Sequence, residues 1–392
     1  MNRASEGKGA VVRGSLRKRG DTWTAYWSIT DGEGKRRQRT KGGFRTRREA
    51  QAHLTSVLSA VQTGTYVEPR KMTVATFLRE EWLPTLTQKN NTRSSYRTTS
   101  ESWIIPTLGG IQLSHLTPAH VQGLLDHLRV AGSRRGTPLS PRSVQYALKV
   151  LKMALTHAVT QGFIPRSPAA AIKRPQAQAA EMQSWTADEA AAFLDHVADD
   201  RLYAAWLLFL QRGLRRGEIA GLRWPDVDLD TGRLSIGHTR VLVDAKPESS
   251  SPKTSAGRRT VPLSPRLVAA LRAHRRRQLE ERMAWGEAWE DTGYVFTRQD
   301  GRPLHPEYLS TAFERHVRKL GARRIRLHDT RHTCASLALQ AGEKTEVVSR
   351  WLGHASVSIT QDIYQHVIPA MIEEAGERLD DIVFSRRKNP QG

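Results

Sequence analysis

Two linker-like stretches, the second of them rich in proline and alanine, divide the chain and restrict what it can fold into. They are TGTYVEPRK, residues 63–71, and RSPAAAIKRPQAQAAEMQ, residues 166–183. Stretches of this composition are typical of linkers, and 392 residues are too many for one ordinary hydrophobic core. We therefore expect three domains, at residues 1–66, 73–175 and 181–392.

The first segment alternates apolar and polar residues with the period of a half-buried strand. DTWTAYWSIT, residues 21–30, is followed by the turn DGEGK and the basic run RRQRTKGGF. Thr46 followed by Glu49 is a capping box, which opens a helix that runs to about Val61. The pattern predicts a small three-stranded sheet with one helix.

The second and third segments are mainly helical. In residues 73–175, Ser140 and Pro141 start a helix whose apolar residues form one stripe, and we expect a bundle of four or five helices. The third segment opens with a capping box, Thr186 to Glu189, and its strand-like runs are RLSIGH, RVLVD and RRTVPL. The predicted fold is thus multidomain α+β: the N-terminal sheet and helix, a helical bundle, and a mainly α domain with a small antiparallel sheet.

The strongly positive net charge of the chain indicates a polyanionic partner. Lys+Arg number 61 and Asp+Glu 39, a formal net charge of +22, and cations that neutralise phosphates release condensed counterions. Basic residues recur in every segment instead of on one amphipathic helix, which favours nucleic acid over a membrane surface. Residues 1–64 contain 14 Lys+Arg and 5 Asp+Glu. The small sheet is therefore predicted to lie against DNA, the alternative being a solvated basic face.

The number of cysteines and the lengths of the apolar runs indicate the cellular compartment in which the protein is expected. Cys334 has no partner for a disulfide inside the chain, and no cysteine cluster for zinc can form. No apolar run approaches the roughly 18 residues of a membrane span, and the first residues lack the apolar core of a signal peptide. We expect a cytoplasmic, nucleoid-associated protein without a membrane partner.

Four polar stretches of the third segment carry residues that suit a reaction at a phosphodiester. They are RGLRRGEIAGL, residues 212–222, SPKTSAGRRTVPL, 251–263, LHDTRHTCASL, 327–337, and LGHASVSITQDIYQHV, 352–367. In the order Arg, Lys, His-x-x-Arg, His, Tyr they resemble the tyrosine recombinases, the phage-integrase family of site-specific recombinases.

The resemblance gives each motif a role. It implies these catalytic residues: Arg215, Lys253, His328, Arg331, His354 and the nucleophile Tyr364, with Glu218 in a supporting position. It implies an arm-binding domain at 1–66, a helical core-binding, SAM-like domain at 73–175 and a catalytic domain at 181–392. The expected activity is integration or excision of a phage or mobile element through a 3′-phosphotyrosyl intermediate and a Holliday junction.

The residue types fit this chemistry independently of the resemblance. A phosphodiester under attack gains negative charge on its non-bridging oxygens, which the guanidiniums of Arg215 and Arg331 can bind bidentately. His328 and His354 can donate hydrogen bonds to the same oxygens, and either can accept the phenol proton. A phenol of pKa about 10 needs such neighbours to become a nucleophile. Lys253 can protonate the departing 5′ oxygen.

No metal and no other cofactor are expected, because the phosphotyrosyl ester retains the free energy of the broken bond. His328 and His332, four residues apart on an expected helix, suggest a zinc pair, but the third ligand and the glutamate base of that motif are missing. The expected partners are double-stranded DNA attachment sites of core and arm type, a homotetramer on DNA, a host bending factor and an excision factor.

Several assignments have alternatives. Tyr364 lies at the edge of an apolar stripe, so helical geometry alone favours a core residue, whereas its place after the other motifs favours the nucleophile. Arg216 competes with Arg215, and Lys246 with Lys253; the frames GLRRGE and PKT favour Arg215 and Lys253. A topoisomerase of type IB, which rejoins the original strand, and a catalytically inert DNA-binding regulator are the alternative functions.

Overall fold

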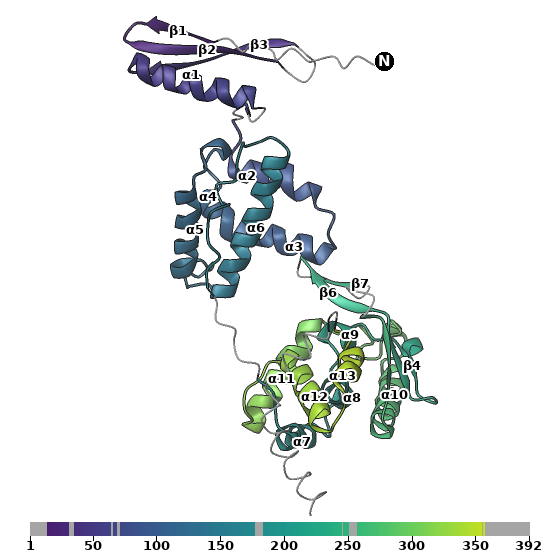
Figure 1. The fold of residues 1–392 in the computed structure, drawn as a ribbon. Coiled ribbons are helices and arrows are strands. Elements are labelled where there is room, and N and C mark those ends of the chain that lie inside the picture. The colour runs from purple at the N-terminus through teal and green to yellow at the C-terminus, as the bar shows by residue number, and fades with distance from the viewer. Residues whose placement is uncertain are drawn as a thin grey trace, which may run out of the picture. The chain divides into compact units, whose positions relative to one another are not determined.

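The computed structural model describes residues 14–30, 35–63, 66–68, 71–176, 183–244, 246–250, 257–354 and 356. Two compact units, Met1–Gln178 and Ala179–Gly392, contain separate hydrophobic cores (Figure 1). Lys253 and Tyr364 lie outside the described residues. The limits of the three expected domains stay a prediction.

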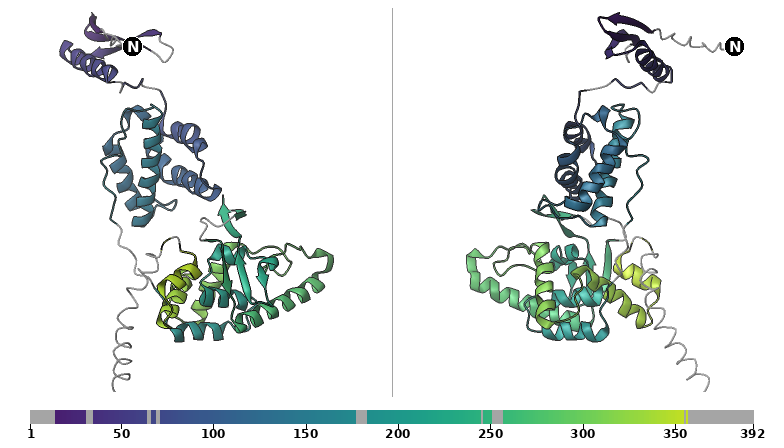
Figure 2. Two further views of the ribbon diagram at one scale, coloured as in Figure 1. Left: turned by 45° about the vertical axis from the view of Figure 1, so that its right-hand side comes forward. Right: turned by 90° about the vertical axis from the view of Figure 1, so that its left-hand side faces the viewer.

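The N-terminal sheet has the predicted form. Strands β1 (Gly14–Arg19), β2 (Thr22–Thr30) and β3 (Arg36–Phe44) pair antiparallel in that order, and helix α1 (Arg47–Gln62) lies along one face (Figure 2). Ala25, Trp27 and Leu54 form the core between them. Thr46 and Glu49 make both bonds of the capping box, so this helix start is confirmed.

The following residues form the predicted helical bundle. Its elements are α2 (Val74–Thr76), η1 (Phe77–Trp82), η2 (Leu83–Thr85), α3 (Asn90–Thr99), η3 (Ser100–Ile104), α4 (Ile105–Leu108), η4 (Leu113–His115), α5 (Pro118–Ala131) and α6 (Pro141–Thr160). The wider π-helical turns η1 and η3 each end two residues before a proline, Pro84 or Pro106. Proline cannot donate the helical hydrogen bond and its ring crowds the preceding turn, which explains these local departures from the α-helix.

The second unit is mainly helical. Its helices are α7 (Ala187–His196), α8 (Tyr203–Arg212), α9 (Arg216–Ala220), α10 (Pro265–Trp285), α11 (Pro306–Leu320), α12 (Thr330–Gln340) and α13 (Thr345–Leu352), with short turns η5 (Trp224–Asp226), η7 (Gly286–Ala288) and η8 (Leu327–Asp329). Helix α8 is apolar nearly all round, and its Trp206 and Phe209 are fully buried. A helix of this kind belongs inside a core, where it supports the loop that follows it.

Two small sheets accompany these helices. One is antiparallel with the order β4 (Val227–Asp228), β5 (Arg233–Ile236), β8 (Arg259–Pro262); the other is a hairpin of β6 (Thr239–Val243) and β7 (Lys246–Ser250). The predicted antiparallel sheet is confirmed, but the strand-like runs had included only β5, β6 and β8. Strand β7, KPESS, lacks apolar alternation and is held by its backbone pairing with β6.

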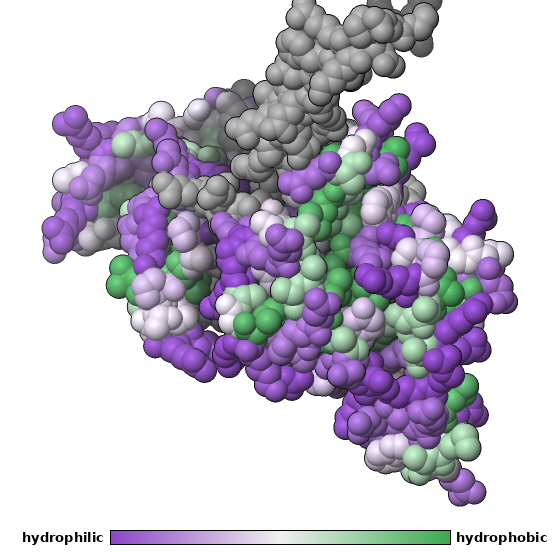
Figure 3. Space-filling model, turned by 90° about the horizontal axis from the view of Figure 1, so that it is seen from below, coloured by the Kyte–Doolittle hydropathy of each residue, from purple (hydrophilic) through white to green (hydrophobic). Residues whose placement is uncertain are grey.

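A small core between α12 and α13 contains Cys334, whose exposure is 4%. Burial raises the pKa of its thiol to about 12. The face drawn in Figure 3 is covered mostly by hydrophilic residues, with hydrophobic ones in patches between them. Within the described ranges, no helix is both long and apolar enough to cross a membrane.

Candidate active site

Arg215 is the residue before α9, directly after a tight connection from α8. Gly213 ends α8 in the left-handed conformation, φ 58°. A Cβ on this glycine would come within 2.5 Å of the Leu352 side chain and would also be strained by the positive φ. The absence of a side chain therefore lets the start of α9 approach the end of α13.

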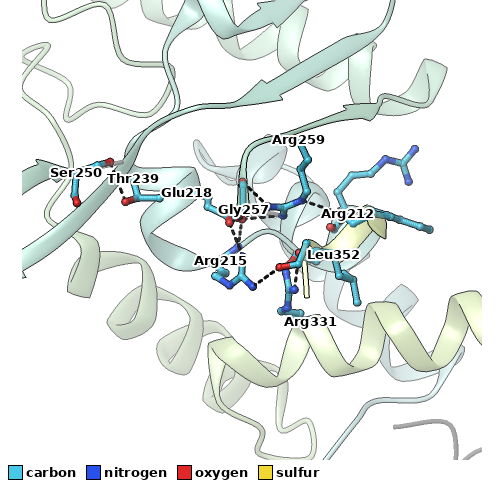
Figure 4. A network of polar contacts seen from close by, with 12 residues as sticks. Arg212, Arg215, Glu218, Thr239, Ser250, Gly257, Arg259, Arg331 and Leu352 are labelled. Atoms are coloured by element: carbon cyan, nitrogen blue, oxygen red, sulfur yellow. Dashed lines mark hydrogen bonds and ion pairs between the residues drawn. The ribbon is translucent and has the colours of Figure 1, made fainter. Parts of the chain in front are cut away.

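A buried carboxylate holds Arg215 in place. Glu218, 2% exposed, accepts a hydrogen bond from Arg215 Nη1 at 2.8 Å and another from the Arg215 backbone N–H at 2.9 Å (Figure 4). Arg259 of β8 donates to both oxygens of the same carboxylate, at 3.0 Å each. Burial opposes ionisation, but these guanidiniums keep the pKa of Glu218 below its usual value. Glu218 is thus a buried anion between two cations.

Arg331 lies in the first turn of α12 and is only 3% exposed. Its Nη1 donates to Gly213 O at 2.8 Å and its Nη2 to Leu352 O at 2.5 Å. Burial, with Arg215 and Arg259 nearby, lowers the pKa of Arg331 to about 9, so the guanidinium is still charged at neutral pH. Its hydrogen-bond partners are neutral carbonyls, so an anion at this place would be strongly favoured.

His354 follows the end of α13. Gly353 terminates the helix in the left-handed conformation, φ 68°, and the His354 backbone N–H bonds back to Ser349 O. Burial and the charges of Arg331 and Arg215 lower the pKa of the half-buried imidazole to about 3. His354 is therefore neutral at physiological pH and can accept a proton or donate one hydrogen bond.

His328 lies in the turn η8 and His332 in the first turn of α12, so they do not share one regular helix as the zinc interpretation assumes. Their rings meet edge to face, with centroids 5.6 Å apart. Partial burial and the charge of Arg331 lower the pKa of both imidazoles, with His332 also acting on His328. As a whole residue His328 is exposed, although its ring is partly buried.

The structure therefore brings Arg215, His328, Arg331 and His354 close together. They come from the starts of α9 and α12 and from the end of α13. Figure 4 shows Arg215 and Arg331 with the Glu218 carboxylate beside Arg215. The result is a cluster of two arginines and two histidines beside the buried carboxylate of Glu218. Such a cluster can bind and neutralise a phosphodiester.

Two arginines in the same place were not assigned from sequence. Arg259 lies two residues before the buried Val261, on the same face of β8. The alternation of the strand therefore contained a signal for Arg259, because it places this cation on the buried face. The Arg212 guanidinium lies over the Trp351 ring, 5.1 Å from its centroid, and the Arg212 carbonyl accepts a hydrogen bond from the indole N–H. These contacts tie the loop before α9 to the last turn of α13.

Replacing Glu218 by alanine is expected to lower the free energy of unfolding by about 3–5 kcal/mol at pH 7, because it leaves buried Arg259 without its counter-charge. Since the pKa of Glu218 is lowered on folding, its contribution is present above the usual value of 4.5 and is lost as pH falls below it through the folded pKa. Urea unfolding between pH 7 and pH 3 measures both effects, with exposed Glu314→Ala as control. An unchanged stability at pH 7 would contradict the prediction.

Comparison with known proteins agrees with the fold. A sequence model of the phage integrase family matches residues 183–371, one of an arm DNA-binding domain matches 15–61, and one of the N-terminal SAM-like domain of phage integrases matches 76–129. The chain is 30% identical over 242 residues to the tyrosine recombinase XerC of Xanthomonas campestris pv. campestris, covering 60% of this chain and 67% of that protein. It is 27% identical over 391 residues to an integrase of Streptomyces ambofaciens, covering 97% of both.

Solved structures share the fold. The Tn1549 transposon integrase in complex with a circular intermediate DNA has a TM-score of 0.64 and 20% identity, over 77% of this chain and 99% of that one. A lambda integrase dimer bound to a COC′ core site has a TM-score of 0.56 and 17% identity, over 93% and 96%. Fold, site and sequence matches define an enzyme that acts on DNA. The chain belongs to the tyrosine recombinase family, as its motifs had indicated.

Proposed function

We propose that this protein is a site-specific integrase that cuts and rejoins DNA through a 3′-phosphotyrosyl ester and a Holliday junction, and so integrates or excises a phage or mobile element. The observation that carries the proposal is the convergence of Arg215, His328, Arg331 and His354 on one cationic site. Such a site complements the phosphorane formed during attack on a phosphodiester.

The proposed reaction assigns one task to each side chain. The Tyr364 oxygen forms a bond to phosphorus while the bond to the 5′ oxygen breaks. The phenol proton passes to His354 or His328, and Lys253 gives a proton to the leaving 5′ oxygen. A 5′ hydroxyl from the other duplex then attacks the ester in the reverse sense. Arg215 and Arg331 hold the non-bridging oxygens throughout.

The assembly is part of the proposal. Exchange of strands between two duplexes needs four tyrosines, so the working form would be a homotetramer on core-type sites, with the domain at 1–66 on arm-type sites. A lambda integrase tetramer bound to a Holliday junction is similar in fold, with a TM-score of 0.57. A host bending factor and an excision factor would set the direction, and the enzyme would work on the nucleoid in the cytoplasm.

Nicked attachment-site DNA tests the chemistry, because the short strand is lost after cleavage and the covalent adduct accumulates. We expect an adduct on a denaturing gel, formed equally well in EDTA. Two differently labelled duplexes then test the strand exchange, and joined products are expected. Relaxation of supercoiled DNA without joining would identify a topoisomerase instead. DNA binding without an adduct would leave only an inert regulator.

Deleting residues 1–64 is expected to impair integration but to spare cleavage of the core site. The N-terminal unit would add a second tethered DNA contact, and tethering raises apparent affinity by on the order of 10²-fold or more without altering the chemistry. The measurement compares adduct formation on a core site with joining of complete attachment sites. If joining stays at the level of the full chain, the N-terminal sheet does not serve arm-site binding.

A further inference from the structure

The C-terminal end of α13 is held by three arginines from three different elements. Arg259 Nε donates to Trp351 O at 2.7 Å, Arg331 Nη2 to Leu352 O at 2.5 Å, and Arg215 Nη2 to Gly353 O at 3.0 Å. The last carbonyls of a helix lack partners within the helix and carry partial negative charge, so cations are favoured there. Three consecutive carbonyls are thus fixed directly before His354.

Arg259 shares the Glu218 carboxylate with Arg215, but its guanidinium is more completely occupied by contacts within the protein. All three nitrogens of its guanidinium donate to protein oxygens: Nε to Trp351 O, and Nη1 and Nη2 to the two carboxylate oxygens of Glu218. Its side chain is 7% exposed, against 39% for Arg215. A bidentate carboxylate already neutralises its charge, whereas Arg331 donates to neutral carbonyls. The contacts of Arg259 therefore serve to position other residues. Arg215 and Arg331 are better suited to bind a phosphate.

Arg259 links segments that are far apart in the sequence. It is the first residue of β8 and comes six residues after Lys253, the expected general acid. Through Glu218 it reaches Arg215 at the start of α9, and through Trp351 O it reaches the turn before His354. Arg212, stacked on the Trp351 ring, restrains the same turn from another side. A single side chain thus connects three segments: β8, the start of α9 with Arg215, and the turn before His354.

We propose that Arg259 is a positioning residue of strand transfer, which sets the distance between Arg215 and His354 through its simultaneous bonds to Glu218 and the end of α13. The inference rests on the proposed function of the site. Arg259 does not touch the DNA in this scheme. Its loss lets the three segments shift relative to one another, and displacements of about 1 Å can slow an enzymatic step by on the order of 10²-fold.

The main test uses Arg259→Lys in the full-length protein, because lysine keeps the buried charge but cannot bind a carboxylate bidentately and a carbonyl at once. On nicked core-site DNA at saturating enzyme, we expect the single-turnover rate of adduct formation to fall about 10-fold, and about 100-fold for Arg259→Ala. The DNA dissociation constant and the final fraction of trapped DNA should match the wild type. The exposed neighbour gives the matched control, Arg258→Lys, which should cleave at the wild-type rate.

A substrate with sulfur in place of the bridging 5′ oxygen separates positioning of the phosphate ligands from positioning of the acid. A thiolate leaves without a proton, so this substrate should restore cleavage by Lys253→Ala. It should leave Arg259→Lys as slow as before, because Arg215 and His354 are still misplaced. A wild-type rate for Arg259→Lys and Arg259→Ala, or a defect confined to DNA affinity or to the trapped fraction, would overturn the inference. A wild-type protein that forms no adduct would instead overturn the proposed function.

Discussion

Replacing Tyr364 by phenylalanine is expected to abolish the covalent adduct between protein and nicked attachment-site DNA. The change removes one oxygen and keeps the aromatic ring, so the expected nucleophile is lost with little change in side-chain volume. Removing the nucleophile of a covalent enzyme lowers the rate by about 10⁴-fold or more. The adduct should fall below detection on a denaturing gel.

The control for this substitution is Tyr308→Phe, which makes the same change at a tyrosine 46% exposed on α11. It should form the adduct at the wild-type rate. Both variants should bind core-site DNA with unchanged affinity, because neither loses a cation. An adduct that persists in Tyr364→Phe would mean that another residue is the nucleophile and that Tyr364 is the packing residue its helical stripe suggests.

Replacing Arg331 by alanine is expected to lower the single-turnover rate of cleavage by about 10³-fold, since one preorganised donor to a developing oxyanion contributes 10²–10³-fold and this donor is also charged. Burial makes the effect large, because water cannot replace a guanidinium that is 3% exposed. Arg331→Lys should retain part of the activity, as a point charge without the bidentate geometry.

The same substitution also affects stability. Gly213 O and Leu352 O lose their donor, and each unsatisfied buried acceptor costs about 1–3 kcal/mol. Rates are therefore compared at a temperature where urea titration shows the variant to be folded, with the exposed Arg324→Ala as control. Cleavage within about threefold of wild type in folded Arg331→Ala would contradict a transition-state role of the expected size.

Local signals predicted most of the fold. The capping pairs Thr46 with Glu49 and Thr186 with Glu189 lie three residues apart, so the sequence alone indicates those helix starts, and the structure confirms them. Strand β7 was missed because a neighbour, not its own pattern, holds it in place. His328 was placed on a helix but lies in the turn before α12, a boundary that depends on how Arg326 and Asp329 bond around that turn.

Sequence motifs indicated some residues of the candidate site. They did not indicate residues that reach the site through contacts between distant parts of the chain. Arg215 and Arg331 stand in frames that identify them, but Arg259 pairs with a glutamate 41 residues earlier and with a carbonyl 92 residues later. No periodicity encodes such separations. Lys253 and Tyr364 stay predictions, because they lie outside the described residues.

Cys334 has a practical consequence. It is the one cysteine in 392 residues, it is 4% exposed, and burial holds the pKa of its thiol at about 12. Maleimide dyes react with exposed thiolates, so the natural chain offers almost no background to such reagents. A single cysteine introduced at an exposed position in each unit would accept a dye selectively. Energy transfer between two such dyes could then report how the parts of the enzyme arrange themselves on DNA, without prior removal of native cysteines.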